Sequence, residues 1–117
     1  MTTKQPLIAS AENMIFRVDS LFLPESARGD FEAGVRRNID FISGLPGYRG
    51  HMVFEKTGGP GVFNLMTITA WASREEHERA AAAVTQYYDS IGFDRRATLS
   101  KWGGKSEVAE FRTLQIS

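Results

Sequence analysis

A histidine and a tryptophan carry the strongest chemical signal in this sequence. His77 lies about one turn after the expected start of a helix, at the end of an otherwise apolar stripe. A helix N-terminus lowers the pKa of a nearby histidine, and a neutral imidazole can accept a proton from a phenol. We therefore expect His77 to act as a general base. A partly buried, structural histidine is the alternative.

Other side chains near this position could bind a ligand. Trp71 precedes the helix, and its ring could stack on a flat aromatic molecule or pack in the core. Asn64 falls in an apolar segment, where an amide needs partners, so we expect it to contact a ligand or a subunit interface. His51 shares one side of an expected strand with Arg49 and Glu55, and Tyr48 falls on the other side. The side of His51 could contact the substrate or form a solvated edge.

Two further pairs of residues are expected to be structural. Arg17 and Asp19 lie on the same side of the first expected strand and are predicted to form a cross-strand or interface charge pair, with a role in the pocket as the alternative. Tyr87 and Tyr88 lie on the apolar stripe of the second expected helix, which favours packing in the core.

Composition excludes several kinds of site. The chain has no cysteine, so disulfides, thiolate metal sites and a cysteine nucleophile are ruled out. Its two histidines fall on different expected elements, and we predict no metal site and no cofactor. The 14 basic residues are balanced by 14 acidic residues, which argues against nucleic acid as a partner.

The sequence also predicts where the chain is found and how it is divided. Its apolar stretches are far shorter than the ~20 residues needed to cross a bilayer, and no secretory leader is evident. We therefore expect a cytoplasmic protein with no membrane partner. Residues 1–13 show no period and are expected to form a flexible tail before a single domain over residues 14–117.

Hydropathy patterns predict the elements that would position the candidate residues. Alternation of apolar and polar residues indicates strands over residues 14–23, 48–56, 62–72 and 108–116. Helical spacing indicates one helix over residues 26–43, with Ser26 as its cap, and a second from Ser73 to Gly92. Ser73 and Glu76 match a capping box at the start of the second helix. Residues 93–107 have no sustained period and are expected to be an irregular connection.

This order of elements is that of a ferredoxin-like βαββαβ unit. The right-handed crossover rule places both helices on one face of a four-stranded antiparallel sheet, so the predicted class is α+β. Segments 14–23 and 62–72 nevertheless carry apolar residues on both sides. We therefore predict that a second copy covers the open sheet face in a homodimer, forming a dimeric α+β barrel.

Short motifs make the chain resemble a known family. They are Leu23-Pro24-Glu25 after the first strand, Leu45-Pro46-Gly47-Tyr48 after the first helix, and Ala70-Trp71-Ala72-Ser73 before Arg74-Glu75-Glu76-His77. In these motifs the chain resembles the antibiotic biosynthesis monooxygenase (ABM) domain of the dimeric α+β barrel superfamily, over residues 14–116. The resemblance implies a pocket between sheet and helices, with Trp71 at the position of the family tryptophan.

The resemblance also implies what the pocket does. In quinone-forming oxygenases of this kind an asparagine stands four residues before the tryptophan and a tyrosine about six after it, where this chain has Thr67 and His77. Haem-degrading members have a histidine about ten residues after the tryptophan, where this chain has Ala81. We therefore expect a cofactor-independent monooxygenase acting on a small phenolic or polyketide-like aromatic substrate.

The expected site combines both lines of reasoning. His77 would be the catalytic base, and the substrate-binding residues would be Trp71, Thr67, Asn64 and His51. Two alternatives stay open because one fold supports many activities. One is a non-catalytic metabolite-binding or accessory barrel. The other is an isomerase or decarboxylase that uses the same histidine.

Overall fold

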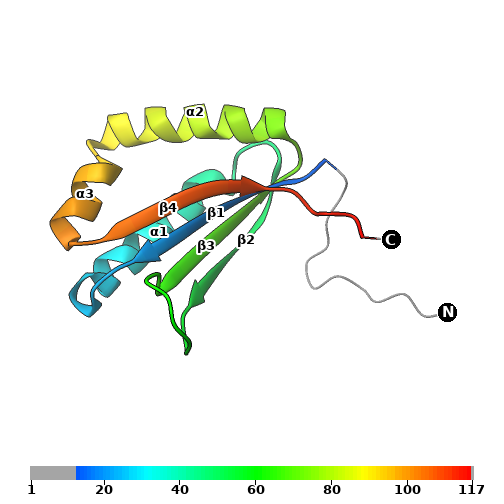
Figure 1. Cartoon of the computed structure of the whole chain (residues 1–117). Helices are drawn as coiled ribbons and strands as arrows, with labels where there is room; N and C mark the ends of the chain where they lie inside the picture. The colour runs from blue at the N-terminus through cyan, green and yellow to red at the C-terminus, as the bar shows by residue number, and fades with distance from the viewer. Residues whose placement is uncertain (1–12, 117) are drawn as a thin grey trace.

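The computed structural model of the chain describes residues 13–116 (Figure 1). The expected flexible tail, residues 1–13, lies almost wholly outside these residues. The described elements follow in the order β1 (Ile15–Phe22), the 3-10 turn η1 (Glu25–Ala27), α1 (Arg28–Ile42), β2 (Tyr48–Glu55), β3 (Leu65–Trp71), α2 (Arg74–Ile91), α3 (Arg95–Trp102) and β4 (Lys105–Phe111). Within residues 13–116, no helix is long and apolar enough to span a membrane.

The strands form one antiparallel sheet in the spatial order β2-β3-β1-β4. This is the strand order of the ferredoxin-like fold, so the predicted α+β class is confirmed. In the view of Figure 1, α1 passes behind the sheet and α2 runs above it, which leaves the opposite face of the sheet without a helix.

Side chains of the strands alternate between these two faces. On the open face Val18 of β1 pairs with Ile68 of β3, which in turn pairs with Met52 of β2. Phe54 and Phe111, at the two outer strands, are 42% and 54% exposed. A row of apolar side chains therefore crosses the open face of the described sheet from one edge to the other.

The buried core is divided between the two ends of β3, because Leu65 and Trp71 are its first and last residues. One cluster consists of Leu21, Leu23, Ala27, Phe31 and Leu65, with Val35, Leu99 and Trp102 packed against it. The other consists of Ile42, Trp71 and Ala80, with Ile39, Phe41, Leu45, Tyr48 and Val84 packed against it. Between these clusters the sheet carries threonine and charged residues, and there the helices stand away from it.

The prediction of an irregular connection over residues 93–107 is wrong, because this segment contains α3 and the start of β4. Asp94 caps α3 by accepting a hydrogen bond from the backbone N of Ala97 at 3.0 Å, and Gly103 ends the helix at φ 72°. Leu99 and Trp102 are the residues of α3 that pack on the core, which is too few to give a helical period. β4 accordingly begins and ends earlier than the predicted 108–116.

Two other boundaries and one orientation differ from the prediction. The 3-10 turn precedes α1, so Ser26 lies before the helix and Ala27 stands at its N-cap without a side-chain bond. β3 begins at Leu65 instead of residue 62. The register of β2 shifts between Tyr48 and Gly50, which turns Tyr48 to the same side of the strand as His51 and away from the predicted opposite side.

Candidate functional site

A cavity of about 900 Å³ lies between the sheet and the helices. Its floor is formed by side chains of the strands, which include Arg17, Asp19, Thr67, Thr69 and Trp71. Its walls come from all three helices: Arg37 and Asn38 from α1, His77 and Tyr88 from α2, and Thr98 and Leu99 from α3. Residues of the two apolar clusters line its ends, whereas polar groups line its middle.

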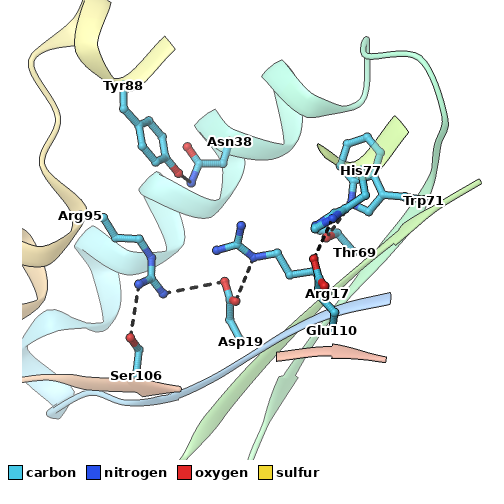
Figure 2. Close-up of polar contacts among 10 residues, drawn as sticks. All are labelled: Arg17, Asp19, Asn38, Thr69, Trp71, His77, Tyr88, Arg95, Ser106 and Glu110. Atoms are coloured by element: carbon cyan, nitrogen blue, oxygen red, sulfur yellow. Dashed lines mark hydrogen bonds and ion pairs between the residues drawn. The ribbon is translucent and has the colours of Figure 1, made fainter. Parts of the chain in front are cut away.

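His77 and Trp71 lie side by side at one end of the cavity. The Ser73 hydroxyl accepts a hydrogen bond from the backbone N of Glu76 at 3.2 Å, which fixes the start of α2 and places His77 in its first turn. The ring centroids of His77 and Trp71 are 6.2 Å apart, and both residues are buried (Figure 2). The structure thus brings together the two residues that carried the sequence signal.

Glu110 of β4 lies against the same histidine. Its carboxylate oxygen is 3.1 Å from Nδ1 of His77, and its other oxygen accepts a hydrogen bond from Arg74 at 3.1 Å. The contact with His77 is electrostatic, since the Nδ1 group is not aligned with the oxygen as a hydrogen bond requires. A carboxylate at this distance favours the tautomer with its proton on Nδ1, which leaves the lone pair on Nε2.

The environment of His77 keeps its imidazole neutral. Burial lowers the pKa of His77 below the ordinary value, and the nearby Glu110 carboxylate opposes this shift only in part. The guanidinium groups of Arg17 and Arg74 lower the pKa further. A neutral, buried imidazole at the end of a cavity has the protonation state that a general base requires near pH 7.

The middle of the cavity contains an ion-pair network in which Arg95 joins the pair that the sequence predicted. Arg17 Nε lies 3.2 Å from one oxygen of Asp19, and Arg95 of α3 lies 3.8 Å from the other (Figure 2). Arg95 also donates to the Ser106 hydroxyl at 3.3 Å. The predicted pair of Arg17 and Asp19 therefore forms within one strand and faces the cavity.

Tyr88 also lines the cavity, although sequence reasoning favoured packing in the core. Its hydroxyl accepts a hydrogen bond from Nδ2 of Asn38 at 2.8 Å. Burial raises the pKa of Tyr88, whereas nearby guanidinium groups oppose the shift. Tyr87 stacks on Phe41, with ring centroids 4.3 Å apart.

The other predicted site residues fall into two groups. Thr67 and His51 line the cavity, and Nδ1 of His51 shares a hydrogen bond with the Tyr48 hydroxyl. Asn64 lies outside the lining. Its Oδ1 accepts from the backbone N of Leu23 at 3.0 Å and its Nδ2 donates to the backbone O of Leu23 at 2.8 Å. Asn64 therefore holds its loop against the residue that follows β1. It does not contact the cavity, where a ligand contact was expected.

Trp71 serves both the core and the cavity. Its Nε1 donates to the Thr69 hydroxyl at 3.2 Å, and the edge of Tyr48 approaches its ring with centroids 5.8 Å apart. These contacts fix the orientation of the indole at the end of the cavity. Within residues 13–116, no group of three or more side chains is arranged to hold a metal ion.

Comparison with known proteins gives matches at the level of structure alone. No family model and no curated protein matches the chain. Among solved structures it is similar to SnoaB from Streptomyces nogalater, a cofactor-independent oxygenase, with a TM-score of 0.64 and 22% identity over 89% of this chain and 96% of that one.

Two further structures are similar over nearly their whole length. A candidate antibiotic biosynthesis monooxygenase from Bordetella bronchiseptica has a TM-score of 0.60 and 17% identity, over 88% of this chain and 99% of that one. A heme-degrading protein, Rv3592 from Mycobacterium tuberculosis, has a TM-score of 0.59 and 15% identity, over 89% and 99%. The predicted likeness is thereby confirmed for the fold: the chain has the ferredoxin-like fold of ABM-type monooxygenases.

Proposed function

We propose that the chain is an ABM-type, cofactor-independent monooxygenase that oxidises a small phenolic or polyketide-like aromatic substrate with molecular oxygen. The observation that carries this proposal is the buried, neutral His77, which lies beside Trp71 at the end of the cavity and 3.1 Å from Glu110. The likeness in fold to SnoaB, a cofactor-independent oxygenase, supports the same reaction class.

Each proposed role follows from the position of a side chain in the cavity. The flat ring of the substrate rests against Trp71, so that the proton to be removed meets Nε2 of His77. Thr67 and His51, which line the floor, hydrogen-bond the oxygen substituents of the ring. Arg17, whose positive charge lowers the pKa of His77, stabilises the negative charge that develops on the substrate.

The reaction balances with oxygen as the oxidant. A ring methylene loses one proton to Nε2 of His77, and its electron pair passes to O₂ as a C–O bond forms. His77 returns the proton to give a hydroperoxide. Loss of the second C–H proton, with cleavage of the O–O bond, leaves one oxygen as a quinone carbonyl and releases the other as water.

We also propose that the working protein is a homodimer. The open face of the sheet presents Val18, Met52, Phe54 and Phe111 to solvent, and the last three are 41%, 42% and 54% exposed in one chain. An apolar surface that extends across a whole sheet is more than a soluble monomer usually exposes. A second copy packed face to face would cover it and complete a barrel.

Oxygen uptake by the purified protein tests this function. We expect anthrone-like substrates or hydroquinones to consume oxygen faster than the uncatalysed rate, in the presence of a metal chelator. Binding without oxygen uptake on every substrate would overturn the proposal in favour of a metabolite-binding barrel. Conversion of a substrate without oxygen consumption would overturn it in favour of an isomerase or decarboxylase.

A further inference from the structure

Three arginine side chains line the same cavity. Arg17 comes from β1, Arg37 from α1 and Arg95 from α3, and all three line the cavity. Each of them opposes the rise in the pKa of Tyr88, so all three guanidinium groups lie within electrostatic range of one hydroxyl. We call these three arginines, with Tyr88 and Asn38, the arginine corner.

The arginine corner is short of negative charge. Asp19 is shared between Arg17 and Arg95, at 3.2 and 3.8 Å. Within residues 13–116, no ion-pair partner is found for Arg37. Asp30 and Lys101 also line the cavity, but they are exposed and cancel each other in charge. One carboxylate therefore faces three guanidinium groups.

Unused hydrogen-bonding atoms lie at the same place. Nε of Arg37 is buried and has no partner, and the adjacent Oδ1 of Asn38 is also buried without one. Arg37 is held in position, since its guanidinium carbon lies 4.5 Å from the centre of the Phe93 ring. Because the Tyr88 hydroxyl accepts from Asn38, its own proton is free to be donated. The buried Nε and Oδ1 are out of reach of a ligand in the cavity, whereas the Tyr88 proton and the positive charge of Arg37 are available to one.

We propose that the arginine corner binds the carboxylate of the substrate, so that the substrate class is an aromatic carboxylic acid. The carboxylate accepts hydrogen bonds from Arg37 and Tyr88, and the ring extends towards Trp71 and His77. The Asp19 carboxylate already lies between Arg17 and Arg95, which leaves Arg37 as the arginine of the corner whose charge is unpaired. This inference rests on the proposed function for the identity of the ligand as substrate, although binding needs no oxidation.

Helices α1 and α3 each contain a neighbouring arginine that can be substituted as a control. Arg36 directly precedes Arg37, and Arg96 directly follows Arg95, yet both of these neighbours are exposed and neither lines the cavity. Replacing either member of a pair removes one positive charge from the protein. Only the replacement of Arg37 or Arg95 removes that charge from the cavity.

Isothermal titration calorimetry on the full chain provides the test, with naphthoate, its neutral amide and naphthyl phosphate as probes. We expect naphthoate to bind about tenfold or more tightly than the amide, because a charge-assisted contact with a guanidinium strongly favours the anion. Arg37→Gln and Arg95→Gln should each reduce this preference, whereas Arg36→Gln and Arg96→Gln should retain it.

Three results would overturn the proposal. The first is equal binding of naphthoate and its amide by the unmodified chain, which needs no variant to fold. The second is an equal loss in Arg37→Gln and Arg36→Gln, which would show a nonspecific effect of charge. The third is tighter binding of naphthyl phosphate than of naphthoate, which would assign the corner to phosphate esters. Carboxylate-selective binding without oxygen uptake would support the arginine corner and reject the oxygenase, so the two proposals fail separately.

Discussion

Nδ1 of His77 lies 3.1 Å from a carboxylate oxygen of Glu110, a contact that joins the first turn of α2 to the end of β4. Arg74 holds the other oxygen of that carboxylate at the same distance, so Glu110 is fixed on both sides. Burial lowers the pKa of His77 by more than Glu110 raises it. The imidazole is therefore neutral near pH 7, with the Glu110 carboxylate beside its Nδ1.

Replacing Glu110 with glutamine should alter both the titration of His77 and the activity. We expect the pKa of His77 to fall further in Glu110→Gln, because the change removes a negative charge that raises it. Oxygen uptake should fall by about tenfold or more, since the preferred tautomer is lost. An NMR titration of the His77 ring proton measures the first effect. Glu32→Gln, at an exposed position of α1 outside the cavity lining, is the control, and an equal response of both variants would contradict the account.

The lowered pKa of His77 makes the stability of the fold depend on pH. Because the folded chain binds this proton less readily than the unfolded chain, the contribution of His77 to the free energy of unfolding is highest above about pH 6.5. It should decrease as the pH falls below that value, by at most about 1.4 kcal/mol per pH unit for this group. Urea unfolding at several pH values should show a smaller decrease in His77→Gln. An identical pH dependence in the two proteins would contradict the lowered pKa.

A charged substitution on the open sheet face should separate the proposed dimer. Phe54 lies on that face and is 42% exposed in one chain, so Phe54→Lys should not disturb the core. Light scattering should give twice the mass of one chain for the unmodified protein and a single-chain mass for the variant. Ala82→Lys, on an exposed position of α2 outside the cavity lining, should stay dimeric. A single-chain mass for the unmodified protein would refute the dimer.

Gly47 should be far more sensitive to substitution than Gly44 in the same loop. It has φ +84°, and a Cβ there would lie within 1.8 Å of Oε2 of Glu76. At Gly44 the nearest atom to a Cβ is 3.8 Å away. We expect Gly47→Ala to lower the free energy of unfolding by more than about 1 kcal/mol, since both strain and overlap act on it. Urea unfolding compares the two variants, and equal losses would contradict this difference.

The parts of the site that lie on helices and strands with a clear cap or hydropathy pattern were predictable from sequence. Ser73 and Glu76 mark the start of α2, and so place His77 in its first turn beside the end of β3. The apolar residues on both sides of β1 and β3 predicted an open face, because alternation assigns each side chain to a face. Trp71 at the end of β3 follows from the same alternation.

The remaining features depend on contacts that a local pattern does not contain. Glu110 reaches His77 only through the pairing of β4 with β1, which sets its register opposite Arg17. Tyr48 is turned by an irregularity in β2 that alternation cannot anticipate. α3 was missed because few of its side chains are apolar, although Asp94 and Gly103 are ordinary helix-boundary residues. The arginine corner needs three elements to be in place before its members meet.

Oxygen uptake by His77→Gln compared with the unmodified chain, on an anthrone-like substrate and across pH, tests the central claim most directly. We predict that the unmodified chain keeps its activity through the ordinary histidine pKa of about 6.5 and loses it only at lower pH, because burial lowers the pKa of His77. His77→Gln should be slower by about a hundredfold with no such dependence. Gln86→Ala, at an exposed position of the same helix, should match the unmodified chain. Equal rates for His77→Gln and the unmodified chain would contradict the account.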